Sequence, residues 1–294
     1  MIDPKIQALL DSHDVALLTL GIELVASQGY VEEVTSLDLS KRQLTKLPEN
    51  LPKLEKLAKL DISLNFLKTL PTNLDDLQNL KSFNASSNQL HNFPTEVCKL
   101  PQLEALFLGN NLLEVLPSEI GQLQPLKRLD LSMTMLHHLP EEIGQLVHLE
   151  DLELWGNHLL NPLPASLFQL TNLRKLHLAN NRLTALPAEI GQLQQLDELI
   201  VYKNYFATLP IEIGRLHQLT WLDLGGNQLT TLTATIGDLS NLEFLILSHN
   251  ALRSLPLSIQ HLAFLEGLDL RSNPLPQSVI DNLKQAMPEC NIEF

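Results

Sequence analysis

The chain repeats one frame, L-x-x-L-x-L-x-x-N-x-L, eleven times at a nearly constant spacing of 23 residues. The frames begin at Val34, Leu57, Leu80, Leu103, Leu126, Leu149, Leu173, Leu196, Leu219, Leu242 and Leu265. One unit of this size cannot bury its apolar face alone, so units at a fixed period stack into a solenoid with a continuous core. The period is unbroken from residue 34 to residue 276, with one 24-residue step after Leu149. It therefore predicts one elongated repeat domain rather than two globular ones.

Each repeat divides into a strand, a turn and a return limb. In the repeat that begins at Leu103, Leu106 and Leu108 alternate with other residues, which is the pattern of a short strand with one buried face. Asn111 follows at the turn, where its amide offers a donor and an acceptor to backbone groups that the bend leaves unpaired. Pro117 and Gly121 mark a return limb with room for only a turn or a short helical stretch. We expect the strands to stack in parallel, about 4.8 Å apart.

The turn asparagine recurs along the chain, so we expect a buried ladder of amides inside the solenoid. The ladder residues are Asn65, Asn88, Asn111, Asn157, Asn181, Asn204, Asn227, Asn250 and Asn273. Arg42 replaces asparagine in the first repeat, and Thr134 replaces it in the fifth. We expect Arg42 to mark a frayed first turn.

Helical patterns flank the repeats at both ends. Asp3 and Pro4 form a helix start, apolar residues follow at helical spacing, and Gly29 ends the pattern. We interpret residues 1–33 as a helical cap, because the end of a leucine core must be covered. A docking or targeting element is the alternative. Residues 277–294 predict a second cap, made of a helix over 277–286 and a final strand near Ile292.

The wording L-P-x-E-I-G-Q-L recurs at 116–123, 139–146 and 186–193. It resembles the Ras-group class of leucine-rich repeat proteins, which includes cytoplasmic scaffolds of eukaryotes and many bacterial proteins, and we expect a bacterial source. The resemblance covers residues 34–276. It implies an α/β solenoid, a horseshoe with eleven parallel strands on its concave face. It also implies protein binding on that face without catalysis by the repeats.

Composition limits the partners and the compartment. The net charge is −14, and the 20 basic residues form no run, so neither nucleic acid nor an anionic membrane is an expected partner. A basic protein partner fits better. The two cysteines, Cys98 and Cys290, lie about eight repeats apart, and such low cysteine usage favours a reducing, cytoplasmic setting. No catalytic motif is present, so we expect no enzyme activity and no cofactor.

The residues free to vary are those that point off the sheet. Both tryptophans of the chain fall there, with other aromatic and apolar side chains close by, and such rings are typical of interface centres. Beside them runs a row of alternating charge with one residue per repeat. The expected binding residues are Trp155, His177, Ile200, Tyr202, Tyr205, Trp221, Phe244, Ile246, Arg128, Asp151, Lys175 and Glu198.

Two other interpretations of these side chains stay open. The rings would also stabilise the sheet as cross-strand neighbours, and the charges would form a structural ladder worth little per pair. We favour binding, because exposed aromatics are sparse on ordinary surfaces. A metal site drawn from neighbouring carboxylates and histidines is disfavoured, because Arg128 and Lys175 compete for the same carboxylates.

The sequence therefore predicts a non-enzymatic protein-interaction module that presents repeats 5 to 10 to a protein or peptide. We expect a monomer. One alternative is a secreted bacterial effector that acts on a host protein inside a host cell. Another is a structural spacer or a self-associating scaffold.

Overall fold

A computed structural model describes residues 2–294, which form two compact units, a first one up to residue 136 and a second one over residues 137–294. The first unit begins with two α-helices, α1 (Pro4–Leu10) and α2 (Val15–Ser27), and a 3-10 helix, η1 (Val31–Glu33). Its strands are β1 (Ser36–Asp38), β2 (Lys59–Asp61), β3 (Ser82–Asn84), β4 (Ala105–Phe107) and β5 (Arg128–Asp130). Its return limbs contain η2 (Leu51–Lys53), η3 (Leu74–Asp76), η4 (Thr95–Lys99) and η5 (Ser118–Gln122).

The second unit continues the same alternation. Its strands are β6 (Asp151–Glu153), β7 (Lys175–His177), β8 (Glu198–Ile200), β9 (Trp221–Asp223), β10 (Phe244–Ile246) and β11 (Gly267–Asp269). Its return limbs contain η6 (Glu141–Gln145), η7 (Ala165–Gln169), η8 (Ala188–Gln192), η9 (Ile211–Arg215), η10 (Ala234–Asp238) and η11 (Leu257–His261). The unit ends with α3 (Gln277–Ala286) and β12 (Asn291–Glu293).

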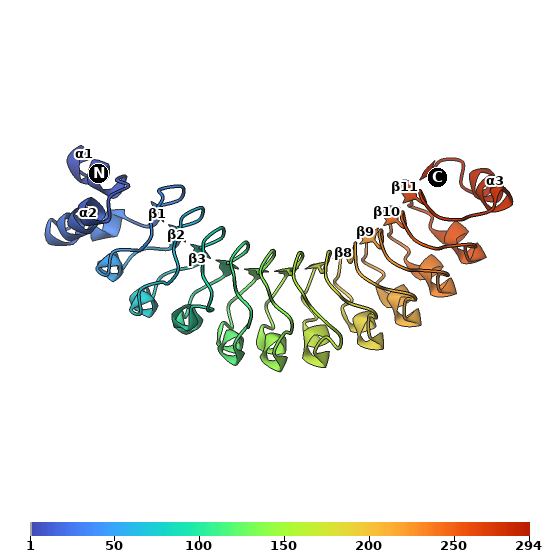
Figure 1. Ribbon diagram of the computed structural model, residues 1–294, viewed down its shortest axis with the longest axis horizontal. Helices are drawn as coiled ribbons and strands as arrows, with labels where there is room; N and C mark the ends of the chain where they lie inside the picture. The colour runs from blue at the N-terminus through green and yellow to red at the C-terminus, as the bar shows by residue number, and fades with distance from the viewer. Residues whose placement is uncertain (1) are drawn as a thin grey trace. The chain divides into compact units, whose positions relative to one another are not determined.

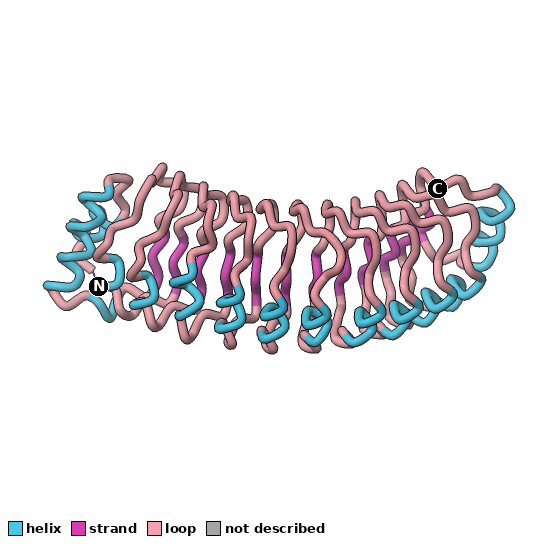
Figure 2. The backbone as a smooth tube through the Cα atoms, turned by 60° about the horizontal axis from the view of Figure 1, so that its bottom comes forward, coloured by secondary structure: helices cyan, strands magenta, loops and turns pink. Residues whose placement is uncertain are grey.

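Within each unit every strand pairs in parallel with the next, one repeat along the chain. Leu60 of β2 pairs with Phe83 of β3, and Leu199 of β8 pairs with Leu222 of β9. The strands of a unit lie along one face, here called the strand face, and the 3-10 helices lie along the opposite face (Figures 1 and 2). The predicted parallel α/β repeat solenoid is confirmed, as are both terminal helical segments and the final strand, β12, which pairs with β11.

The middle residue of each strand points into the core, and the residues on either side of it point off the strand face. Leu152, Leu176, Leu199, Leu222 and Leu245 all have negligible exposure. Their neighbours in the strands are partly or fully exposed. The period-2 pattern of the repeat frame thus fixes which side chains a partner can touch.

The asparagine ladder is buried as predicted. Asn181 is 6% exposed, and its amide nitrogen donates to the carbonyls of Leu154 and Leu178, each at 3.0 Å. Its amide oxygen accepts from the backbone N–H of Leu159 at 3.0 Å, in the preceding repeat. The amide oxygens of seven other ladder residues likewise accept from the preceding repeat, and their amide nitrogens donate to carbonyls of both repeats, so each of these amides joins two repeats: Asn65, Asn88, Asn111, Asn204, Asn227, Asn250 and Asn273.

Arg42 does not mark a frayed turn. Its guanidinium donates to the carbonyl of Ser12 at 3.1 Å and to that of Leu10, at the C-terminal end of α1. It also donates to the carbonyl of Asp38 in its own repeat. Because the long side chain reaches back about 30 residues, it ties the N-terminal helices to the first repeat.

Helices α1 and α2 cover the leucine core of the first unit. Ile22 and Leu18 of α2 have no exposed surface, whereas Leu20 of the same helix is 47% exposed. Asn50 donates to the carbonyl of Thr19 at 2.9 Å, which fixes α2 to the return limb of the first repeat. None of the helices in residues 2–294 combines the length and the apolar character needed to cross a membrane.

Candidate protein-binding surface

Eleven of the twelve predicted binding residues lie in the second unit, in its strands or in the turns that follow them. The twelfth, Arg128, begins β5 in the first unit. Its guanidinium lies 5.9 Å from the centroid of the Phe107 ring, in the preceding strand, β4. This is a cation–π contact between strand neighbours. The surface described below is the strand face of the second unit.

A network of charged side chains crosses β6, β7 and β8. Its members, here called the charge network, are Glu153, Lys175, His177 and Glu198. Lys175 Nζ lies 2.8 Å from Glu198 Oε2, and His177 Nε2 lies 2.9 Å from Glu198 Oε1. The other ring nitrogen, His177 Nδ1, lies 2.7 Å from Glu153 Oε2. His177 therefore lies between two carboxylates, and Glu198 contacts both Lys175 and His177.

The network shifts the ionisation of its members. Burial disfavours the charged imidazolium, but the hydrogen bond and charge of Glu153 and the charge of Glu198 outweigh it and raise the pKa of His177. Burial likewise opposes ionisation of Glu198, but the hydrogen bond from Lys175 and the charge of His177 lower the pKa of Glu198. The hydrogen bond to Glu198 raises the pKa of Lys175, and the charges of Glu198 and Asp151 add to that rise. Near neutral pH the network is a fixed polar edge of the surface.

The raised pKa makes the contribution of His177 to stability depend on pH. Because the folded state holds the proton more tightly, this contribution is full below the ordinary histidine pKa of about 6.5 and is lost as the pH rises through the raised value. Replacement of His177 by glutamine is expected to destabilise the protein more at pH 5.5 than at pH 9. Urea unfolding at both pH values measures this, with the exposed His148→Gln as the control. An equal loss at both pH values would contradict the network.

Aromatic and apolar side chains occupy the strand face beyond the charge network. This group, here called the aromatic surface, comprises Ile200, Tyr202, Trp221, Phe244 and Ile246. The rings of Trp221 and Phe244 lie with centroids 4.8 Å apart, tilted by 35°. A methyl group at Gly267 would lie 2.8 Å from Phe244 Cδ1, so the glycine leaves room for that ring. Trp221 and Phe244 stack as cross-strand neighbours and still keep part of their surface exposed.

Two other predicted aromatics are more exposed and stand apart. Trp155, which follows β6, is 39% exposed, and Tyr205, which follows β8, is 50% exposed. The Tyr202 ring carries the ammonium of Lys203 at 5.1 Å from its centroid. Trp155 and Tyr202 occupy the same position of the repeat, and Ala179 occupies that position in the repeat between them. At normal strand spacing the positions of Trp155 and Tyr202 are about 9–10 Å apart. Trp155 therefore lies at the β6 end of the charge network, two residues after Glu153 in the same repeat.

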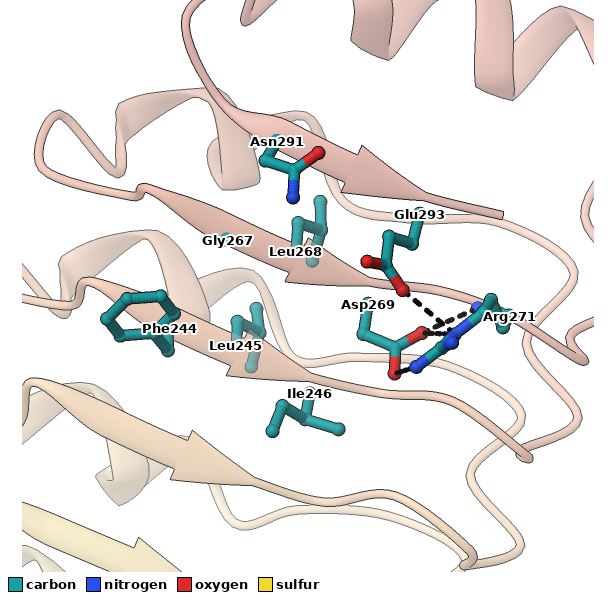
Figure 3. Close-up of a pocket in the computed structure, with 9 residues that line it drawn as sticks. All are labelled: Phe244, Leu245, Ile246, Gly267, Leu268, Asp269, Arg271, Asn291 and Glu293. Carbon is teal, nitrogen blue, oxygen red and sulfur yellow. Dashed lines mark hydrogen bonds and ion pairs between the residues drawn. The ribbon is translucent and has the colours of Figure 1, made fainter.

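A hollow of about 260 Å³ opens where the aromatic surface meets the last strands. Figure 3 shows it between Phe244 and Ile246 of β10, Gly267 of β11 and Asn291 of β12. At its edge Arg271 donates to Asp269 at 2.8 and 3.0 Å and lies 3.1 Å from Glu293 (Figure 3). The missing side chain of Gly267 creates the hollow, and the bound guanidinium closes one end of it.

Three residues of this surface were not predicted as binding residues: Asp223, Gly225 and Gly267. Asp223 lies between Ile200 and Ile246 in the register of the sheet. The sequence signal that could have found this part of the surface is glycine: Gly225 and Gly267 each stand at an outward-facing position where most other repeats have a larger residue. Among the residues that the structure describes, no group of three histidine, cysteine or acidic side chains is placed to hold a metal ion.

The chain matches known protein families and solved structures. Residues 117–205 match the family described as "Leucine-rich repeat region", and residues 241–262 match the family "Leucine Rich Repeat". A solved leucine-rich repeat protein of Leptospira interrogans is 30% identical, with a TM-score of 0.50, over 88% of this chain and 83% of that one. The chain is a leucine-rich repeat protein. Such proteins are typically non-enzymatic scaffolds for protein interactions.

Two further solved structures share the fold of this leucine-rich repeat protein. The Arabidopsis receptor kinase HAESA, solved with the peptide hormone IDA and the co-receptor SERK1, is 31% identical with a TM-score of 0.67. The match covers 82% of the chain and 46% of HAESA, so the chain spans less than half of that receptor. Internalin InlF of Listeria monocytogenes is 19% identical with a TM-score of 0.74, over 100% of the chain and 91% of the internalin, which shows the fold alone. A search of curated protein sequences finds no match.

Proposed function

We propose that the chain is a protein-interaction module and that its binding surface is the strand face of the second unit, from β6 to β11. The observation that carries this proposal is the aromatic surface, where Trp221, Phe244 and Tyr202 stay partly exposed on a rigid sheet. Exposed rings bury a large area on binding at little cost in side-chain entropy. The charge network borders these rings, as a polar rim borders an interface centre. HAESA, a structural relative, was solved with a peptide hormone, and a peptide or an extended protein segment suits this surface.

The proposal retains the predicted anchors and assigns them different roles. Trp221 and Tyr202 provide apolar contact area at the centre. Lys175 and Glu198 neutralise each other and mainly set the register and association rate of a partner. Arg128 contacts Phe107 in the first unit, and its role in binding stays a prediction.

Trp221→Ala is expected to weaken binding at least about 30-fold, because truncation of a central aromatic side chain commonly costs about 2 kcal/mol or more. The probes are 12-residue peptides selected from a random phage-displayed library on the immobilised wild-type chain, and fluorescence anisotropy measures their affinity. Lys175→Ala is the control, with an expected change of less than about threefold at moderate salt. Matching urea midpoints would show that both variants keep the fold.

Two outcomes would contradict this proposal. In one, the selection enriches no peptide. In the other, the enriched peptides bind Trp221→Ala and Tyr202→Ala as tightly as the wild type, which would place their site elsewhere on the chain.

Self-association is a second candidate function, because the face of the second unit that carries the 3-10 helices also exposes apolar side chains. Ile211 and Phe264 are each 64% exposed and line one shallow hollow, and Leu257 is 81% exposed. Light scattering coupled to size-exclusion chromatography tests this. A mass that rises with concentration and falls back in Phe264→Ser would support a self-associating scaffold, and a constant monomer mass would exclude it.

The Ras-group class, a bacterial source and a cytoplasmic setting are also proposals. Secretion into a host cell is the alternative setting. Both settings would use the same surface, because the side chains of the strand face are the same in either one.

A further inference from the structure

The hollow beside Phe244 lies at the end of a row of aromatic rings on the strand face. Trp221, Phe244, Gly267 and Asn291 occupy equivalent places in β9 to β12 and pair in register. The rings of Trp221 and Phe244 have centroids 4.8 Å apart, which is the ordinary spacing of neighbouring strands. At the next place Gly267 carries no side chain, and the hollow of about 260 Å³ opens there (Figure 3). The row of rings therefore stops at a gap.

The gap at Gly267 has room for one aromatic ring. The strand positions of Phe244 and Asn291 lie two spacings apart, about 9–10 Å, and a ring in contact with a neighbour on each side needs about 7–8 Å. The Phe244 ring leans toward the gap, because a methyl group at Gly267 would lie 2.8 Å from its Cδ1. A guest that enters from solvent has no atom at that methyl position, so it can lie against the ring. Phe244 thus contacts Trp221 on one side and lines the hollow on the other.

The charged end of the hollow favours an uncharged occupant. Arg271 donates to both carboxylate oxygens of Asp269, and its Nε also lies 3.1 Å from Glu293 Oε2 (Figure 3). A cationic guest would meet the guanidinium that already neutralises these acids, and an anionic guest would meet two carboxylates. Phe244 and Ile246 supply an apolar wall at the other end. A neutral, apolar side chain therefore fits this lining better than either ion.

We propose that this hollow binds an aromatic side chain of the protein partner, which packs on Phe244 as the third ring of the row. Aromatic pairs at centroid distances of about 4.5–7 Å are stabilised beyond the apolar area that they bury, so a ring is preferred to an aliphatic group of the same size. The net charge of −14 disfavours a second copy of this chain and favours a partner segment with basic residues beside the ring. This inference rests on the proposed function of the strand face and names the chemistry of its occupant.

The test uses the full chain and a small probe, N-acetyl-phenylalanine methylamide, with its saturated counterpart N-acetyl-cyclohexylalanine methylamide beside it. Both probes carry a six-membered carbon ring, but only the first ring is aromatic. The readout is the Cδ1 methyl signal of Ile246, which lines the hollow, and Ile246→Val assigns this signal in the methyl NMR spectrum. We expect a saturable shift with the aromatic probe and at least about threefold weaker binding of the saturated probe.

Two variants test the hollow itself. Phe244→Leu is expected to weaken the aromatic probe at least about threefold and to abolish the preference over the saturated probe, because the ring that distinguishes them is gone. Gly267→Phe is expected to abolish the saturable shift, because the ring of the chain itself fills the hollow. Trp221 and Phe244 occupy the equivalent places in β9 and β10, so the repeat accepts a ring there.

Phe66→Leu is the matched control. Phe66 is 49% exposed and lies in the first unit, so the same substitution there is expected to leave the affinity of both probes unchanged. Matching urea midpoints would show that Phe244→Leu and Gly267→Phe keep the fold.

Several results would overturn the inference. They are an Ile246 signal that does not shift or does not saturate, equal or tighter binding of the saturated probe, an unchanged preference in Phe244→Leu, unchanged binding in Gly267→Phe, or an equal loss in Phe66→Leu. If library peptides depend on Trp221 while the aromatic probe fails, this inference falls and the proposed function stands. If the selection enriches no peptide while the probe binds as expected, the proposed function falls alone.

Discussion

Asn181→Ala is expected to lower the free energy of unfolding by about 3 kcal/mol, because it leaves several buried backbone groups without partners at about 1–3 kcal/mol each. The wild-type amide satisfies the N–H of Leu159 and the carbonyls of Leu154 and Leu178. Asn181 itself is only 6% exposed, so water does not replace these bonds freely. The loss weakens the junction between two neighbouring repeats.

The matched control is Gln192→Ala, at an exposed position of η8 one half-repeat further along the chain. Both variants remove a side-chain amide. They differ in the hydrogen bonds that this amide makes in the wild type. Urea unfolding followed by circular dichroism compares the two midpoints. Equal midpoints would show that the asparagine ladder does not hold the repeats together.

The fold was predictable because the same residues both mark the repeat and build it. Leucine at the middle of each strand and asparagine at each turn are required by burial, and burial repeats every 23 residues. The return limb between Pro117 and Leu123 left room for one short helix, and η5 occupies it. Periodic apolar patterns of this kind determine the secondary structure with little help from distant contacts.

Arg42 shows where this kind of prediction fails. From the repeat frame alone, an arginine at the asparagine position indicates a broken turn. The structure instead uses its length to reach the carbonyls of Leu10 and Ser12, in a segment that belongs to no repeat. A departure from a pattern says that the usual partner is lost, but it does not reveal which new partner replaces it.

The candidate site was only partly predictable. Register placed Trp221, Phe244 and Lys175 on the strand face, because each strand pairs with the next at the same position of the repeat. The pairings between side chains depend on their rotamers. His177 joins Glu198 from the neighbouring row of positions, a contact that a row-by-row reading does not give.

Ile22→Ala is expected to lower the free energy of unfolding by about 2–5 kcal/mol, because it opens a cavity between α2 and the leucine core of the first unit. Ile22 has no exposed surface, and Leu18 and Val25 bury the same face of the helix. The cap also brings Asn50 into its hydrogen bond with Thr19. Damage to this packing exposes apolar side chains that the repeats themselves cannot cover.

Leu20→Ala on the same helix is the control for this prediction. Leu20 is 47% exposed, so its truncation is expected to change the free energy of unfolding by less than about 0.5 kcal/mol. Both Leu20→Ala and Ile22→Ala replace an aliphatic residue by alanine, so their effects on helix propensity are similar. Urea midpoints separate the two variants, and light scattering reports the aggregation expected of Ile22→Ala near its unfolding midpoint. If both variants unfold like the wild type, α2 does not seal the core. The helix would then be an appendage, and its exposed leucines would become candidates for the docking role that the sequence left open.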